Sequence, residues 1–144
     1  MPIIEIKGDL LKSDCDVWAH GCNCFHTMGS GIALSIRTKY PEVAYIDRTG
    51  TENGDVNKLG TFTKAQIDKL TIYNLYQQYR YGRDKMHLEY DKLAMALLAM
   101  KRDLIANGVY NTAKIGMPRI GCNLAGGDWS IVSKIIEEIF CDVT

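Results

Sequence analysis

Segments typical of β-strands alternate with segments typical of α-helices along this chain of 144 residues. Short runs rich in β-branched and aromatic residues predict strands, whereas apolar residues that recur every three or four positions predict helices. The expected strands cover residues 3–7, 16–20, 59–65, 70–76 and 113–117. The expected helices cover residues 31–39, 88–106 and the segment after Asp128. This alternation favours an α/β fold whose sheet is mainly parallel and covered by helices on both faces.

Local signals refine these boundaries. The first helix is expected to end before Pro41, because proline disfavours helical geometry in the residue before it. The carboxylate of Asp128 is expected to cap the last helix. The polar residues 48–58 are expected to form an exposed connection, and the strand over residues 59–65 is expected at a sheet edge.

Length and composition suit one soluble domain over residues 1–144. Hydrophobic residues make up 47% of the chain, enough for one substantial core. No apolar run approaches the roughly 20 residues needed to cross a bilayer, and the chain does not start like a signal peptide. We therefore expect a cytoplasmic protein that does not associate with membranes, is a monomer and keeps its five cysteines reduced.

The charge balance bears on possible partners. Seventeen basic residues match seventeen acidic ones, so the formal net charge is zero. Such a chain lacks the positive field that attracts a nucleic-acid backbone. General DNA or RNA binding is therefore disfavoured.

Two glycine-rich segments are candidates for anion binding. Gly29 and Gly31 flank Ser30 at the expected start of a helix, where unpaired N–H groups and the helix dipole attract an anion. A tight turn packed against the sheet explains an isolated pair of glycines at least as well. Residues 117–127 repeat the arrangement after another strand, and two such loops suit a diphosphate.

Three common site patterns are absent from the sequence. Neither loop is a Walker loop or the Rossmann fingerprint that follows a first strand. The spacing of Cys22 and Cys24 between His20 and His26 departs from that of structural zinc sites, and Cys22 and Cys122 lack a cysteine-nucleophile signature. No metal and no cofactor is expected.

Polar residues near the strand ends are candidates for chemistry. His20, Asn23 and His26 would supply a proton-transfer group, an orienting amide and a second imidazole, although a lone histidine is more often structural. Asp9 either accepts a hydrogen bond from an exocyclic amine such as that of adenine or caps a turn. Residues 77–82 are either the rim of a sugar site or an ordinary surface connection.

Four short segments occur in a fixed order along the chain. They are Gly8-Asp9-Leu10, His20-Gly21-Cys22-Asn23-Cys24, Gly29-Ser30-Gly31-Ile32-Ala33 and Pro118-Arg119-Ile120-Gly121-Cys122-Asn123-Leu124. Together they resemble the macrodomain family of ADP-ribose-binding proteins. The resemblance covers nearly the whole chain and implies a three-layer α/β/α sandwich with a mixed, mainly parallel central sheet.

The resemblance also implies a ligand, ADP-ribose or a 1″-substituted derivative, and its placement. Adenine would lie near Asp9, the diphosphate between the two glycine-rich loops, and the distal ribose near Asn23. The implied ligand-binding residues are Asp9, Leu10, Gly29, Ser30, Gly31, Ile32, Ala33, Arg119, Ile120, Gly121, Cys122, Asn123 and Leu124.

The resemblance to one group within the family also implies an activity. Residues 20–24 and 126–129 look most like the ADP-ribose-1″-phosphate phosphatase group of yeast and phages, in which a histidine matching His20 is implicated. The branch that removes ADP-ribose from acidic side chains or DNA uses a lysine near the position of Tyr81 and an aspartate at that of Ala125. Hydrolysis of ADP-ribose-1″-phosphate to ADP-ribose and phosphate is therefore expected.

Other functions stay open at this stage. The same pocket would suit cleavage of an ADP-ribosyl linkage on a protein or a related ester, or non-catalytic recognition of ADP-ribose. A weaker alternative is an RNA-end or nucleotide-binding module. Because related sequences continue into a further strand, the sheet is expected to lack its final C-terminal strand.

Overall fold

A four-stranded sheet forms the centre of the protein in the computed structural model, which describes residues 8–29, 31–80, 87–120, 122 and 126–141. The strands are β1 (Val17–Cys22), β2 (Phe62–Ile67), β3 (Leu70–Tyr76) and β4 (Ile115–Gly116). Their order is β2-β3-β1-β4. β1 is parallel to β3 and β4, whereas β2 is antiparallel to β3. The expected mixed, mainly parallel sheet is confirmed, and β2 lies at an edge of the described sheet, as predicted.

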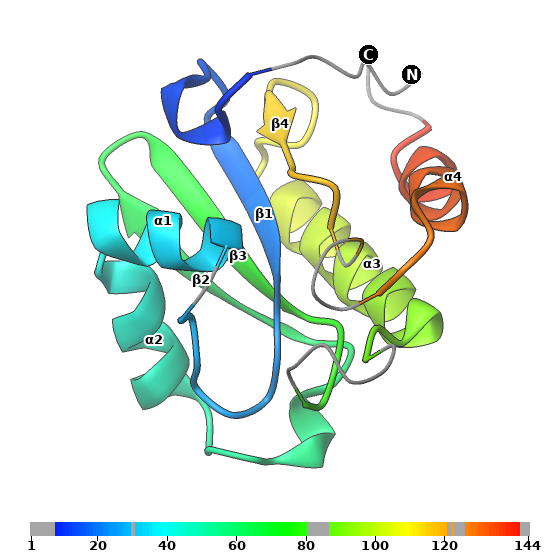
Figure 1. Ribbon diagram of the computed structural model, residues 1–144. Helices are drawn as coiled ribbons and strands as arrows, with labels where there is room; N and C mark the ends of the chain where they lie inside the picture. The colour runs from blue at the N-terminus through cyan, green and yellow to red at the C-terminus, as the bar shows by residue number, and fades with distance from the viewer. Residues whose placement is uncertain (1–7, 30, 81–86, 121, 123–125, 142–144) are drawn as a thin grey trace.

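Helices cover both faces of this sheet (Figure 1). They are α1 (Gly31–Lys39), α2 (Glu42–Gly50), α3 (Tyr90–Ala106) and α4 (Trp129–Ile139), with short 3₁₀ turns η1 (Leu10–Lys12) and η2 (Val56–Lys58). α1 and α2 pack on one face, and α3 and α4 pack on the other. The expected three-layer α/β/α sandwich is therefore confirmed.

The two faces of β1 belong to different halves of the core. Val17 and Ala19 pack with α3 and α4, whereas Trp18 and Cys22 pack with α1 and α2. Successive side chains of a strand point to opposite faces, so His20 falls on the face of Trp18 and Cys22. Burial on both faces explains why this strand is apolar along most of its length.

Sequence signals located two of the helices well. α1 covers the residues predicted for it and ends before Pro41. The Asp128 carboxylate caps α4 by accepting a hydrogen bond from the Ser130 N–H at 2.9 Å. None of the helices in the described part of the chain is long and apolar enough to cross a membrane.

One local expectation is corrected by the structure, and a second concerns residues that the structure does not describe. Residues 48–58 are not simply an exposed connection, because α2 extends to Gly50 and the side chain of Lys58 is buried. α2 was not anticipated because Asp47 lies on its buried face beside Val43 and Ala44, which interrupts the apolar pattern. The strand expected over residues 3–7 lies outside the described residues.

Candidate functional site

The loops that leave the carboxyl ends of β1 and β3 pack against each other. The Cys24 N–H donates to the Tyr79 carbonyl at 3.0 Å, and the rings of Phe25 and Tyr79 meet edge to face with centroids 4.8 Å apart. The Tyr79 hydroxyl also donates to the Gly54 carbonyl at 2.8 Å. Open sheets of this type bind ligands beyond the carboxyl ends of their strands, so this edge is the candidate site.

Asn23 holds the shape of the β1–α1 loop. Its side-chain amide donates to the Thr27 hydroxyl at 2.7 Å and to the Thr27 carbonyl at 3.3 Å, while Oδ1 accepts from the Phe25 N–H at 2.8 Å. Both amide protons are therefore used inside the loop. One lone pair of Oδ1 is left for a further donor.

The glycine-rich end of this loop opens α1. Gly31 has φ of +60°, a left-handed conformation that residues with a Cβ rarely adopt. Gly29 has no such conformation, and both glycines have open space where a Cβ would lie. The first N–H groups of a helix have no partners within the helix, so this end offers donors to an anion.

The loop between β4 and α4 combines core and surface positions. Ile120 is buried among α3 and α4 residues, and the Arg119 guanidinium lies 5.5 Å from the centroid of the partly buried Trp129 ring system. Cys122 is partly buried and its thiol donates to the Ile120 carbonyl at 3.2 Å. Burial raises the pKa of Cys122, which keeps it a thiol at neutral pH.

His20 is fully buried and does not contact solvent. Its side chain has no exposed surface, and Nε2 lies 2.6 Å from Asn74 Oδ1. Because Asn74 Oδ1 is an acceptor only, Nε2 carries the ring proton and donates it. Nδ1 is buried without a hydrogen-bond partner. Burial lowers the pKa of His20, opposed by the Asn74 hydrogen bond and the charge of Asp47, so the neutral ring is favoured.

A chain of polar side chains that sequence reasoning missed continues from His20 across the α2 side of the sheet. Asn74 donates to the Thr63 hydroxyl at 3.0 Å, and Thr63 and Tyr76 share a hydrogen bond of 2.9 Å. Tyr76 donates to Asp47 Oδ1 at 2.5 Å, so Thr63 must donate to Tyr76. The proton directions therefore all run toward Asp47. The clearest signal of this network in the sequence is one amide, Asn74, inside the mostly apolar strand β3.

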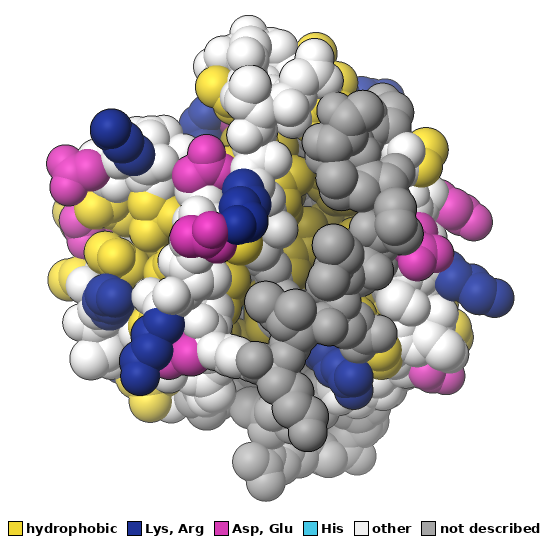
Figure 2. All heavy atoms as spheres, turned by 90° about the horizontal axis from the view of Figure 1, so that it is seen from above, with side chains coloured by type: hydrophobic (Ala, Val, Ile, Leu, Met, Phe, Trp, Pro, Cys, Tyr) yellow, Lys and Arg dark blue, Asp and Glu magenta, His cyan; other side chains and the backbone are white. Residues whose placement is uncertain are grey.

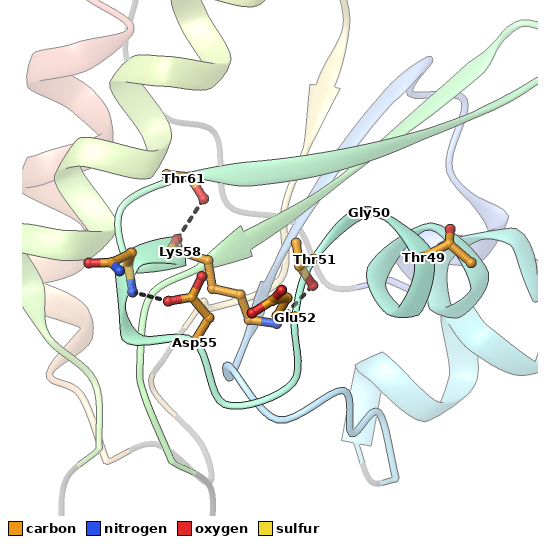
Figure 3. A pocket seen from close by; sticks show the side chains of 8 residues that line it. Thr49, Gly50, Thr51, Glu52, Asp55, Lys58 and Thr61 are labelled. Atoms are coloured by element: carbon orange, nitrogen blue, oxygen red, sulfur yellow. Dashed lines mark hydrogen bonds between the residues drawn. The ribbon is translucent and has the colours of Figure 1, made fainter.

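A second branch links Asp47 to His26. Lys58 Nζ lies 3.9 Å from Asp47 Oδ1 and donates to the Thr51 hydroxyl at 2.9 Å. His26 Nε2 lies 2.9 Å from that same hydroxyl. Figure 3 shows Lys58 reaching toward Thr51 beside an open hollow of about 510 Å³ at the end of α2. Within the described residues, His20 and His26 are thus linked through this network of hydrogen bonds and the Lys58–Asp47 ion pair.

The cysteine side chains of this region favour the neutral thiol. In the described ranges, no group of three His, Cys, Asp or Glu side chains is placed to hold a metal ion. Burial raises the pKa of Cys22, and it raises that of Cys24 to about 11. On the face seen in Figure 2, basic and acidic side chains are interspersed.

Comparison with known proteins gives several relatives that extend over nearly the whole chain. An uncharacterized 17.5 kDa protein of Enterobacteria phage T4 is 36% identical, with 95% of this chain and 89% of that protein covered. ADP-ribose glycohydrolase OARD1 of Homo sapiens is 33% identical over 96% of this chain and 84% of that protein. The ADP-ribose 1″-phosphate phosphatase of Saccharomyces cerevisiae is 24% identical over 99% of this chain and 95% of that protein. No family model matches the chain.

Solved structures agree with this relationship. A protein of unknown function from Bacteroides thetaiotaomicron superposes with a TM-score of 0.81 and 28% identity, covering 96% of this chain and 92% of that one. The macrodomain of Mycobacterium tuberculosis DarG superposes with a TM-score of 0.76 and 21% identity over 95% of this chain and 90% of that one. The chain belongs to the macrodomain family.

The predicted ligand-binding residues of this macrodomain fall into separate groups. Asp9 is exposed and caps η1, its Oδ1 accepting from the Leu11 N–H at 3.0 Å, while Leu10 packs near Gly116 of β4. Lys39, the last residue of α1, donates to the Leu11 carbonyl at 3.3 Å. This contact links the turn that Asp9 caps to the last residue of α1.

The remaining predicted residues are placed as follows. Ile32 and Ala33, in the first turn of α1, are partly buried against the sheet. Ser30, Gly121, Asn123 and Leu124 lie outside the described residues. Ligand contact by any residue of the predicted set stays a prediction, as does catalysis by His20, Asn23 and His26. For His20 the buried ring restricts the prediction, because direct contact with substrate requires that the ring be uncovered.

Proposed function

We propose that this macrodomain binds ADP-ribose and hydrolyses ADP-ribose-1″-phosphate to ADP-ribose and phosphate. The observation that carries the proposal is the meeting of the β1–α1 and β3–α3 loops at the edge where α1 begins. It is supported by relatives, named as hydrolases of ADP-ribose compounds, that match nearly the whole chain.

The arrangement of the loops suits an elongated ligand. Asp9 caps η1, which Lys39 at the end of α1 contacts, whereas Asn23 lies in the loop that leads to the start of α1, a helix of nine residues. A helix of that length extends about 13 Å at 1.5 Å per residue. Adenine near Asp9 and the distal ribose near Asn23 would leave the diphosphate beside the start of α1, where N–H groups are unpaired.

The reaction requires stabilisation of phosphoryl charge and one proton transfer. Water attacks phosphorus, the bond between phosphorus and the ribose oxygen breaks, and the ribose oxygen gains a proton. Preorganised backbone donors at a helix start stabilise the charge that develops on the phosphoryl oxygens. A neutral imidazole near the loop takes the proton from water, a role for which histidine has a suitable ordinary pKa.

Cleavage of an ADP-ribosyl linkage is the second candidate, and one observation favours it. The human glycohydrolase is more similar to this chain, at 33% identity, than the yeast phosphatase is, at 24%. Against it stand the sequence positions Tyr81 and Ala125, where the resemblance leads us to expect a lysine and an aspartate in that branch. This residue difference is the reason for preferring the phosphatase.

The test is product analysis on two substrates. The purified chain is incubated with ADP-ribose-1″-phosphate and, separately, with a peptide that carries ADP-ribose on a glutamate, while ADP-ribose affinity is measured by calorimetry. We expect the chain to release phosphate from ADP-ribose-1″-phosphate and to leave the modified peptide intact. Release of ADP-ribose from the peptide alone would establish the glycohydrolase, and binding without turnover of either would establish a reader.

Two histidine variants assign the proton transfer. His26→Ala should lower phosphate release about 100-fold or more while keeping ADP-ribose affinity, because general bases contribute at least that factor. His20→Gln keeps a donor toward Asn74 and should retain most activity if His20 acts only through the buried network. If His20→Gln loses activity but keeps ADP-ribose affinity and stability, His20 and not His26 is the proton-transfer residue.

A further inference from the structure

We infer that Thr51 is a positioning residue that holds the ring proton of His26 on Nε2 and so leaves Nδ1 as the proton acceptor of the site. The acceptor role rests on the proposed function. The placement of the proton rests on hydrogen bonds alone.

The Thr51 hydroxyl has one proton and three partners. Thr51 Oγ1 lies 2.6 Å from the Asp47 carbonyl oxygen, which has no proton, so the hydroxyl proton is donated there. The other two bonds must then be accepted by Oγ1. Lys58 supplies one proton, and His26 Nε2 supplies the other.

The position of Thr51 is fixed from two sides. Its backbone directly follows α2, and the helix carbonyl that accepts its proton belongs to Asp47, whose side chain is held by Tyr76 and Lys58. Lys58 and Asp47 are only 6% and 2% exposed. A hydroxyl held this way cannot turn its proton toward His26 without losing the short bond to the carbonyl.

His26 itself is held in an unfavourable backbone conformation. Its φ is +54°, which is unusual for a residue with a Cβ. Such conformations persist where the surroundings hold them, and they gather at functional sites. Within the described residues the bond to Thr51 is the one hydrogen bond made by the ring, and Nδ1 makes none. The neutral ring therefore presents an unprotonated Nδ1.

The consequence for the reaction is a defined destination for one proton. Water adds to phosphorus and transfers a proton to His26 Nδ1 as the bond from phosphorus to the ribose oxygen breaks. The protonated His26 ring then gives that proton to the ribose oxygen and returns to its neutral form, so the products are ADP-ribose and phosphate. The other ring tautomer would place an N–H where the acceptor is needed.

Nitrogen NMR of the histidine rings tests the proton placement without substrate. The chain has three histidines, so a His26→Gln variant assigns the His26 signals in ¹⁵N-labelled protein. At a pH where the ring is neutral, we expect Nε2 protonated and Nδ1 unprotonated. Thr51→Val removes the hydroxyl at nearly constant shape and should produce a mixture of tautomers, and Thr51→Ser should restore the single form.

Thr38→Val provides the matched control. Thr38 is an exposed residue of α1 whose hydroxyl donates to the Leu34 carbonyl, so this change removes a similar helix hydroxyl that is not hydrogen-bonded to His26. Its His26 spectrum should equal that of the parent chain. A protonated Nδ1 in the parent, or an unchanged spectrum in Thr51→Val, overturns the inference.

Kinetics test the acceptor role separately. Thr51→Val should lower kcat about tenfold or more, with ADP-ribose affinity changed less than about twofold, since proton transfer contributes about 100-fold or more. Thr51→Ser should recover most of kcat. If the parent chain turns over no substrate while its spectra are as expected, the proposed function and the acceptor role fall, and the proton placement stands.

Discussion

His20 illustrates how burial sets the chemistry of a single side chain. Its ring is fully enclosed, donates to Asn74 through Nε2 and leaves Nδ1 without a partner. A charged ring would place a second proton on Nδ1, where no acceptor is available. Burial lowers the pKa of His20, against the opposing effects of the Asn74 hydrogen bond and the charge of Asp47, and so links the protonation of this residue to the stability of the fold.

The stability of the protein should therefore fall in acid through His20. Its pKa in the folded state lies below the ordinary value of 6.5. Below that value the unfolded chain binds a proton that the folded chain does not. The free energy of unfolding is therefore unaffected by His20 above about pH 6.5. It decreases as pH falls below that value, by at most about 1.4 kcal/mol per pH unit. Urea unfolding of the parent and of His20→Gln at several pH values measures this effect: the parent should lose stability relative to His20→Gln only on the acid side.

The two glycines of the first loop make a matched pair for a second prediction. Gly31 needs φ of +60° and Gly29 does not, while neither has an atom within 4 Å of the point that a Cβ would occupy. Gly31→Ala should therefore destabilise the fold by about 1 to 2 kcal/mol through its backbone alone. Gly29→Ala should cost clearly less. Equal losses in urea unfolding would show that the conformation of Gly31 is not what the loop requires.

Residue types were easier to predict at the candidate site than the contacts between them. Asn23, His26 and Gly29 lie in the loop after β1, and His20 lies within that strand; all were named from the sequence. Thr51 was not, because it meets His26 across 25 positions in the chain. The buried network likewise joins residues 54 and 29 positions apart, and no local pattern encodes such meetings.

Among the elements, those with a complete local signature were predicted most closely, whereas α2 and the extent of β4 were not. α1 has glycines before it and a proline after it, and α4 has the Asp128 cap followed by a strongly amphipathic face. β4 is reduced to Ile115–Gly116 within the longer apolar segment predicted there. Side-chain polarity cannot tell how far such a segment pairs, since pairing depends on the neighbouring strand.

The contact between β1 and the end of β3 gives a third prediction. A Cβ on Gly21 would overlap the side chain of Gln77, which is 3% exposed. Gly21→Ala should therefore destabilise the fold by about 1 to 3 kcal/mol through overpacking. Adding Gln77→Ala makes room for the new methyl group. The double variant should therefore lose less stability than the sum of the two single losses. Additivity within about 0.5 kcal/mol in urea unfolding would contradict direct contact.

At the scale of the whole molecule, the three-layer arrangement brings distant segments to one edge. The β1–α1 and β3–α3 loops meet there because β1 and β3 are parallel neighbours in register, with Cys22 opposite Tyr76. The parallel order also explains why each crossover contains a helix or a second strand. The sheet topology therefore determines where the site lies, and the side chains of the two loops determine its chemistry.

The charge of the whole molecule leads to the last prediction. The formal net charge is zero, and charges of both signs are interspersed on the face seen in Figure 2. A protein that contacts six to ten phosphates loses about 10³-fold or more in affinity between about 50 mM and about 200 mM salt. Binding of this chain to a short single-stranded RNA should be weak and should change only a few-fold over that range. Fluorescence anisotropy of labelled RNA measures it, with ADP-ribose added as competitor. Tight binding with a steep salt dependence that ADP-ribose reverses would mean that the same edge recognises an RNA end.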